Sequence, residues 1–341
     1  MKAWIIERVS DLMTENNPLK LVELPKPEPN AGELLIKIST CGVCHTEIDE
    51  IEGRTPPPVY PVVPGHQAVG IVEQTKGISG DFKVGDRAGV AWIFSACGTC
   101  DYCLSGKENL CEHFRATGRD ANGGYAEYMV VPEKFAYPIP GFFTDAEAAP
   151  LLCAGAIGYR SVELAEMSDG KRIGLTGFGA SAHLVLKMIK YRYPRSEIYV
   201  FARSQKEREF AMELGAQWGG DTQDKPPYLL DCIIDTTPVW EPIVCALECL
   251  KPGGRLVINA IRKESIDKEQ LLNIDYSRHL WMEKEIKSVA NVTSHDVRSF
   301  IQLAANMQFK PEVEIYPFEN ANLAIMEIKQ RKIKGAKVLV L

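Results

Sequence analysis

The chain has 341 residues, of which 45% are hydrophobic and 25% are charged, and its formal net charge is −6. This composition is ordinary for a globular protein, and the length favours two domains over one. The weak negative charge argues against nucleic-acid or anionic-membrane partners, and no apolar run approaches the roughly 20 residues of a membrane-spanning helix. Ten cysteines, several at metal-type spacing, predict a reducing cytoplasmic location.

Residues 1–152 contain short apolar or alternating runs that are separated by glycine and proline. This pattern predicts an all-β unit, a partly open barrel with long loops. The candidate strands are 33–40, 66–74, 86–92 and 125–132.

From residue 153 onward, helical and apolar strand-like segments alternate. The expected helices are 153–167, 180–193, 205–215 and 241–250, and the expected strands are 171–179, 197–204, 231–237 and 253–260. This alternation predicts βαβ units and a doubly wound parallel sheet, so the chain as a whole belongs to the α/β class. The last fifty residues are expected to hold one helix (294–307), one strand and a terminal strand (337–341).

Four cysteines stand close together in the stretch CGTCDYCLSGKENLC, at Cys97, Cys100, Cys103 and Cys111. Zinc prefers tetrahedral thiolate coordination, and two-residue gaps let neighbouring sulfurs converge on one point. A disulfide pair would not need four thiols at this spacing. The stretch therefore predicts a closed structural zinc site.

Three other segments carry possible metal ligands. Cys44, His66 and Cys153 would supply a Cys₂His set with an open fourth position, as a catalytic zinc requires. Each residue is a weak signal by itself, and spacing does not decide between Cys41 and Cys44. The three segments together make the prediction specific.

A G-x-G-x-x-A motif, formed by Gly177, Gly179 and Ala182, follows an apolar strand and opens a helix. The first glycine permits a tight turn, the second lets the backbone approach a pyrophosphate, and the small third residue allows helix–strand packing. The helix N-terminus would then meet the phosphates with free N–H groups. The motif predicts a dinucleotide site.

The chain resembles the zinc-containing medium-chain alcohol dehydrogenases over nearly its whole length. The matching runs, in family order, are GVCHTE, VVPGHQAVG, VGDRAGVAW, CGTCDYCLSGKENLC, GGYAEYMVVP, AAPLLCAGAIGY and GFGASAH. The resemblance implies a GroES-like catalytic domain (1–152), a Rossmann domain (153–289) and a C-terminal return to the first domain (290–341). It also implies two zinc ions per subunit, an NAD(P)(H)-linked reaction of a small alcohol with its aldehyde or ketone, and a homodimer or homotetramer.

The resemblance assigns roles to single residues. It favours Cys44 over Cys41 as the ligand, makes Thr46 the acceptor of the alcohol proton, and places a cofactor-phosphate contact, sometimes part of the proton relay, at His45. Trp92 occupies a position that commonly narrows the substrate pocket, although simple core packing would also explain it.

The chain departs from the family near the metal. Gln67 stands where a glutamate is common, which should leave the site more positive. Glu47 replaces a common aspartate that orients the ligand histidine, and could do so with a longer arm. Glu52 stands where some members have a histidine as terminal proton acceptor; a carboxylate can act as that base, or can simply be solvated.

Coenzyme specificity is expected at the end of the second strand of the Rossmann unit, where NAD users place an acid. Family alignment puts Ala202, Arg203 and Ser204 there, without a carboxylate to repel a 2′-phosphate and with a guanidinium to bind one. We therefore expect a preference for NADP(H), with NAD use as the alternative if Arg203 merely covers the adenine or points to solvent. A family arginine that faces the phosphates is replaced by Ala336, and Lys334 and Lys337 are the neighbouring candidates to take its place.

Two alternatives remain open at this point. The same site could act on a polyol or on a bulky aromatic aldehyde. The departures at Glu47, Glu52 and Gln67 also allow a non-catalytic protein that binds the cofactor and zinc.

Overall fold

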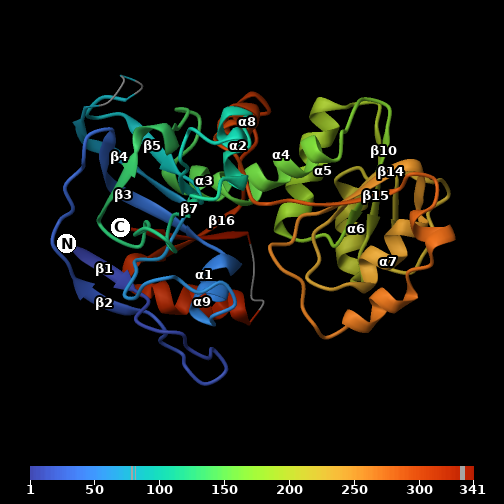
Figure 1. Ribbon diagram of the computed structural model, residues 1–341, viewed down its shortest axis with the longest axis horizontal. Coiled ribbons are helices and arrows are strands. Elements are labelled where there is room, and N and C mark those ends of the chain that lie inside the picture. Colours follow the sequence, from blue (N-terminus) through green and yellow to red (C-terminus); the bar gives the residue numbers. More distant parts are fainter. Residues whose placement is uncertain (78–79, 81, 331–334) are drawn as a thin grey trace. The chain divides into compact units, whose positions relative to one another are not determined.

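The computed structural model describes residues 1–77, 80, 82–330 and 335–341, and the chain forms two compact units. Unit 1 comprises Met1–Ala156 and Val292–Leu341, and unit 2 comprises Ile157–Asn291. In Figure 1 the red C-terminal strands can be followed as they rejoin the blue strands of unit 1. The expected domain boundaries, after residues 152 and 289, lie within four residues of these divisions.

A bent, seven-stranded sheet forms the centre of unit 1, in the order β16-β17-β3-β4-β5-β9, with β8 paired to β3. The long strand β3 (Glu33–Val43) pairs with β4 along one edge; on the other edge it pairs with β8 near its start and with β17 near its end. Register shifts at Leu35/Ile36 and Ile38/Thr40 bend this strand, as β-bulges do. The remaining strands are β4 (Ala68–Lys76), β5 (Arg87–Val90), β8 (Tyr128–Pro132), β9 (Ala136–Pro138), β16 (Val313–Pro317) and β17 (Ala336–Val340).

Two small antiparallel pairs and several short helices complete unit 1. The pairs are β1 (Lys2–Ile5) with β2 (Lys20–Glu23), and β6 (Ile93–Ser95) with β7 (Arg115–Ala116). The helical segments are α1 (His45–Ile51), α2 (Asp101–Leu104), η1 (Glu108–Leu110), η2 (Glu133–Phe135), α3 (Asp145–Ala148), η3 (Ala149–Leu152), α8 (Ser294–Asn306), η6 (Phe318–Asn320) and α9 (Ala321–Lys329).

The last fifty residues contain a second helix, so the expectation of one helix there was wrong. Helix α9 buries an apolar stripe at helical spacing, formed by Ala321, Ala324, Ile325 and Ile328. The stripe is short and interrupted by polar residues, which is why the sequence pattern did not reveal it.

Unit 2 is a six-stranded, wholly parallel sheet with the order β12-β11-β10-β13-β14-β15. Its strands are β10 (Arg172–Thr176), β11 (Glu197–Phe201), β12 (Trp218–Gly220), β13 (Leu230–Asp235), β14 (Leu250–Ile258) and β15 (Glu285–Ser288). The helical segments are α4 (Ala154–Leu164), most of which belongs to this unit, α5 (Ala180–Arg192), α6 (Gln205–Glu213), α7 (Glu241–Glu248), η4 (Lys268–Asn273) and η5 (Tyr276–Leu280).

The strand order of unit 2 reverses between β10 and β13, which is the topological switch point of a doubly wound sheet. Four of the five residues of β10 and five of the six of β13 are buried, the pattern of strands covered on both faces. The α/β class and the combination of a β-rich unit with a Rossmann-type sheet are thus confirmed. Among the described helices, none is both long and apolar enough to cross a bilayer.

Candidate active site and metal centres

Two cysteines and one histidine converge in unit 1. The Sγ atoms of Cys44 and Cys153 and one ring nitrogen of His66 lie within 4.8 Å of one another. His66 Nε2 is 3.6 Å from Cys44 Sγ and 3.3 Å from Cys153 Sγ. A tetrahedral zinc ion with ordinary bond lengths separates sulfur and nitrogen ligands by about 3.5 Å. The donor set therefore fits zinc, and it contains Cys44 rather than Cys41.

The junction of β3 and α1 holds the Cys44 thiol in place. Cys44 follows the last residue of β3 and caps α1 with an extended backbone. Its Sγ accepts the N–H of Thr46 at 3.3 Å, and its own N–H donates to Glu47 Oε2 at 2.8 Å. Cys44 and Glu47 form the capping box of this helix, so the start of α1 and the orientation of the thiol depend on each other.

Glu47 also contacts the other side of the histidine ring. Its Oε1 lies 2.7 Å from His66 Nδ1, and the two side chains are 0% and 1% exposed. A carboxylate in this position fixes the ring orientation and leaves Nε2 to face the thiols. One side chain therefore orients two of the three candidate ligands.

The Cys44 thiol needs a nearby cation to ionise. The neighbouring Cys153 thiol and burial raise the pKa of Cys44 well above its ordinary value. A bound zinc ion favours the thiolate form by direct coordination. The chemistry of this buried donor set thus matches a metal centre better than a set of structural thiols.

Glu50 is a second buried carboxylate on α1, which the sequence analysis missed. It lies one helical turn after Glu47, is 1% exposed, and neither oxygen has a hydrogen-bond partner among the described residues. Burial and the nearby Glu47 raise the pKa of Glu50 well above its ordinary value. The exchange of a glutamate for the buried Gln67 was expected to leave the site more positive, and Glu50 offsets this only in its ionised form, which the raised pKa disfavours.

The other expected residues of this site differ in exposure. His45 is exposed and Thr46 is half-buried, both in the first turn of α1. The Trp92 ring is partly buried, with its centroid 5.0 Å from that of Phe114, and its Nε1 has no hydrogen-bond partner within the described ranges.

Glu52 is held in ion pairs at the end of α1. It contacts Arg54, and its Oε1 accepts a hydrogen bond from Lys329 Nζ of α9 at 2.6 Å. Burial acts to raise the pKa of Glu52, but the hydrogen bonds from Lys329 and Arg54 outweigh it and lower the pKa. Glu52, considered above either as a terminal proton acceptor or as a solvated side chain, is therefore a mostly buried carboxylate that is held ionised, which weakens it as a base.

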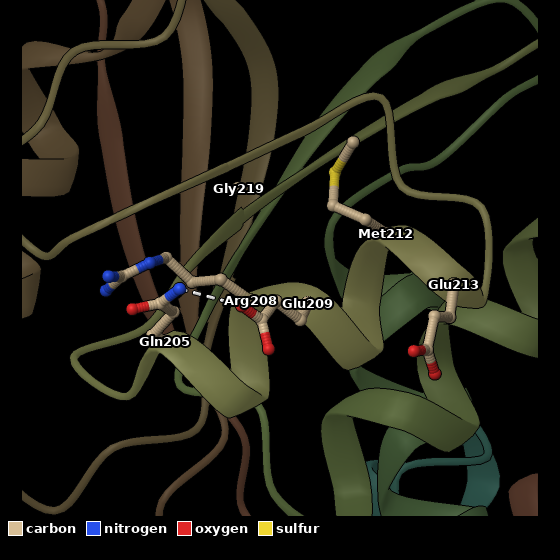
Figure 2. A pocket seen from close by; sticks show the side chains of 6 residues that line it. All are labelled: Gln205, Arg208, Glu209, Met212, Glu213 and Gly219. Carbon is tan, nitrogen blue, oxygen red and sulfur yellow. Dashed lines mark hydrogen bonds between the residues drawn. The ribbon is translucent and has the colours of Figure 1, made fainter.

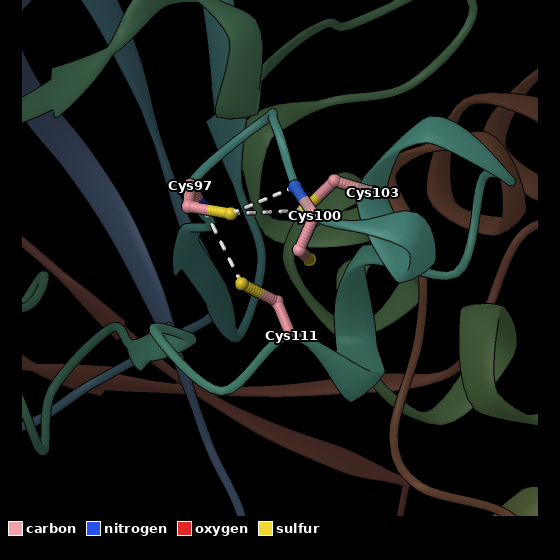
Figure 3. Close-up of side chains that lie close together, drawn as sticks. All are labelled: Cys97, Cys100, Cys103 and Cys111. Atoms are coloured by element: carbon pink, nitrogen blue, oxygen red, sulfur yellow. Dashed lines mark hydrogen bonds between the residues drawn. The ribbon is translucent and has the colours of Figure 1, made fainter.

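The four cysteines of the 97–111 stretch converge as expected, and Figure 3 shows their side chains pointing toward one another. The Sγ atoms of Cys97 and Cys103 are 3.9 Å apart, close to the roughly 3.8 Å between two thiolates on one tetrahedral zinc. Hydrogen bonds from Thr99 and the Cys100 N–H lower the pKa of Cys97 to about 5. All four are free cysteines.

The glycine loop of unit 2 has the geometry of a phosphate cradle. Gly177 follows β10 with φ of 74°, which glycine adopts without strain, and Gly179 caps α5. A Cβ added to Gly179 would meet nothing within 4 Å, so the backbone at this helix N-terminus is open to a ligand. Ala182, completely buried, supplies the close helix–strand packing.

The end of β11 carries no acid, as expected, and the turn after it is contacted by Arg208 of α6, which the sequence analysis overlooked. Ala202 is buried, whereas Arg203 and Ser204 are exposed. Arg208 Nη1 donates to the carbonyl oxygens of Ala202 at 2.6 Å and Arg203 at 3.0 Å, which fixes this turn.

A shallow hollow lies beside this turn, on α6 and β12 (Figure 2). It is lined by Gln205, Arg208, Glu209, Met212, Glu213 and Gly219. Its two carboxylates make it a poor place for a phosphate.

Lys337, one of the two lysines considered as phosphate contacts, forms hydrogen bonds within unit 1 instead. Lys337 is buried in unit 1, and its Nζ contacts Glu314, Glu327 and the Tyr316 hydroxyl. These three partners use all three N–H donors of the ammonium group, so Lys337 cannot also hold a phosphate. Lys334 lies outside the described residues.

Comparisons with known proteins agree with this architecture. Residues 30–141 match the alcohol dehydrogenase GroES-like domain family. A probable alcohol dehydrogenase of Mycobacterium tuberculosis is 39% identical over 100% of this chain and 97% of its own length, and an alcohol dehydrogenase of Geobacillus stearothermophilus is 30% identical over 99% of each. Among solved structures, a cinnamyl alcohol dehydrogenase of Sorghum bicolor superposes with a TM-score of 0.83 at 26% identity, covering 99% of this chain and 97% of that one.

Proposed function

Because the chain belongs to the zinc-containing medium-chain alcohol dehydrogenase family, we propose that it interconverts small alcohols with their aldehydes or ketones using NAD(P)(H). The observation that carries this proposal is the convergence of Cys44, His66 and Cys153 within 4.8 Å. The carboxylate of Glu47 behind the imidazole supports the same conclusion, because structural thiols have no need of an oriented histidine.

Cys44, His66 and Cys153 would hold a catalytic zinc ion, which when bound supplies a Lewis acid for the substrate oxygen. Glu47 keeps the imidazole turned so that Nε2 faces the two thiols. Thr46 has its hydroxyl two residues after Cys44, where it can accept the proton that the alcohol loses.

Two exposed or partly exposed side chains would complete this site. The exposed His45 can pass the proton from Thr46 to solvent or contact a cofactor phosphate. Trp92, which is partly buried, would narrow the substrate pocket.

A second zinc ion would be held by Cys97, Cys100, Cys103 and Cys111. Four thiol donors leave no open position, so this ion would have a structural role. The expected content is therefore two zinc ions per chain.

The dinucleotide would bind with its pyrophosphate at Gly177 and Gly179, and it supplies the hydride chemistry when bound. We expect NADP(H) to be preferred, because no acid ends β11 and Arg203, two residues after that strand, would supply a guanidinium for the 2′-phosphate. The bonds from Arg208 hold the Arg203 backbone in place for this contact.

A homodimer or homotetramer that assembles through unit 2 is the expected form, in the cytoplasm. The edge strand β15 is exposed over all four residues. Large apolar side chains are exposed nearby, at Leu272, Tyr276, Trp281, Met282 and Ile286. An exposed apolar patch next to a sheet edge favours association with a second copy.

The direct test is oxidation of alcohols followed at 340 nm with NAD and NADP in separate assays. The panel should contain short primary and secondary alcohols, a polyol and an aromatic alcohol. Turnover of at least one alcohol class supports the proposal, and the pattern identifies the substrate class. A zinc-loaded protein that turns over none of them, and reduces none of the matching aldehydes, would sink the enzyme assignment in favour of a binding role.

A further inference from the structure

A buried ion pair lies at the carboxyl edge of the unit 2 sheet. Asp235, the last residue of β13, is 0% exposed, and Lys263, in the segment after β14, is 7% exposed. Lys263 Nζ is 2.5 Å from Asp235 Oδ2. Burying two charges costs desolvation energy, which can cancel the attraction between them. Stabilisation of the fold alone is therefore a weak explanation for this pair.

The ammonium group of Lys263 is fully used by the protein. Besides Asp235, its Nζ donates to the carbonyl oxygens of Thr237 at 2.7 Å and Val239 at 2.9 Å. An ammonium group has three N–H donors, and all three are now assigned. Lys263 is therefore not a phosphate ligand, although it is a cation near a dinucleotide cradle; it is a tether for residues 236–239.

Asp235 joins this tether to the switch point of the sheet. Its Oδ1 accepts hydrogen bonds from Thr176 Oγ1 at 2.6 Å and from Thr237 Oγ1 at 2.7 Å. Thr176 is the last residue of β10, so one hydrogen bond bridges the two strands between which the strand order reverses. Ligands of open α/β sheets bind in the crevice at this point.

The tethered loop packs directly against the glycine turn. A Cβ added to Gly177 would lie 3.0 Å from both Thr236 Oγ1 and Thr237 Cγ2. Thr236 Oγ1 in turn donates to the carbonyl oxygen of Thr176 at 2.9 Å. The position of residues 236–239 therefore limits where the Gly177 backbone can lie.

We propose that Asp235 and Lys263 are positioning residues for the dinucleotide, because they fix residues 236–239 against the glycine turn that receives the pyrophosphate. This inference rests on the proposed function, since it assumes that the glycine turn binds a dinucleotide. It predicts that loss of the tether weakens coenzyme binding without removing any group that touches the reacting atoms.

The variants are Lys263→Met and the double variant Asp235→Asn/Lys263→Met. The single variant leaves a buried carboxylate without its cation, which is strongly destabilising. The double variant removes both charges, while the asparagine keeps an acceptor oxygen for Thr176. The matched control is Lys251→Met. Lys251 Nζ pairs with Asp231 Oδ1 at 2.8 Å near the starts of β14 and β13, whereas Asp235 ends β13 and Lys263 follows the end of β14.

Binding is measured by fluorescence titration with NADH and NADPH, alongside melting temperature and the separate values of kcat and KM for the coenzyme. We expect the double variant to bind about tenfold more weakly or worse, with a raised coenzyme KM and a kcat at saturating coenzyme close to wild type. The control should keep the wild-type Kd even if its melting temperature falls.

A folded double variant with the wild-type Kd would overturn the inference. So would a loss of affinity in the Lys251→Met control equal to that in the double variant, because general destabilisation of the sheet would then be the cause. A wild-type chain that binds neither NADH nor NADPH would overturn the proposed function together with the inference.

Discussion

His66 Nδ1 lies 2.7 Å from Glu47 Oε1, with both side chains almost completely buried. The same carboxylate accepts the N–H of Cys44, so Glu47 links two candidate ligands that are 22 residues apart in sequence.

Loss of a carboxylate behind a ligating histidine typically lowers metal affinity by 10- to 100-fold. Glu47→Ala should therefore weaken zinc binding at this centre by about that factor, measured by competition with a chromogenic chelator.

Glu52→Gln, at the C-terminal cap of the same helix and outside the ligand cluster, is the matched control for this measurement and should keep the wild-type affinity. Equal affinity of the Glu47→Ala variant and the wild type would show that Glu47 has no part in holding the metal.

The four-cysteine cluster should contribute to stability rather than to chemistry. Cys97→Ser removes one thiolate of four and should lower both the zinc content by one ion and the melting temperature, because structural zinc contributes free energy of folding directly. Cys245→Ser, on α7 and outside both clusters, should change neither quantity. A Cys97→Ser variant with unchanged zinc content and melting temperature would contradict the structural assignment.

Arg203 should decide the coenzyme preference. Arg203→Ala removes the guanidinium beside the ribose position and should raise the KM for NADP about tenfold or more while the KM for NAD changes little. Arg195→Ala is the control, because Arg195 precedes β11 at its other end, is 79% exposed and pairs with Asp169. If the wild type uses NAD as well as or better than NADP, the preference itself is refuted.

Glu52 should make the free energy of unfolding depend on pH. The pKa of Glu52 in the folded protein lies below the ordinary value of 4.5. Its ionised form therefore stabilises the fold fully above pH 4.5, and this contribution is lost as the pH falls through the folded pKa. Glu52→Gln should be less stable than wild type by about 1 kcal/mol at pH 7, with the difference narrowing in acid.

Denaturant unfolding at a series of pH values measures this difference, and alcohol turnover is measured in parallel. Because the ion pairs with Lys329 and Arg54 weaken Glu52 as a base, the variant should retain most of its turnover. A large loss of turnover at neutral pH would instead restore Glu52 to the proton path.

The sequence was most informative where local pattern and chemistry coincide. The buried strands β10 and β13 are nearly continuous apolar runs, and the cysteine spacing of the 97–111 stretch needs little tertiary information to predict convergence. Cys44, by contrast, was separated from Cys41 only through the family resemblance. Both lie near the end of β3, and the capping of α1 by Cys44 has no distinct sequence signal.

The features that the sequence did not reveal depend on contacts between distant segments. Glu50 looks like any polar residue of a short helix, and its burial depends on elements packed around α1. Lys263 pairs with Asp235 across 28 residues, without a local motif. Helix α9 is specified by packing of a short apolar stripe, and the commitment of Lys337 to three partners on β16 and α9 follows from the same packing.

The most direct test of the central claim is zinc content per chain, measured together with alcohol turnover, in the wild type and in Cys153→Ala. The account predicts two zinc ions and turnover in the wild type, and one zinc ion with turnover abolished in a folded Cys153→Ala variant. A Cys153→Ala variant that retains two zinc ions and wild-type turnover would contradict the assignment of Cys44, His66 and Cys153 as the catalytic metal centre.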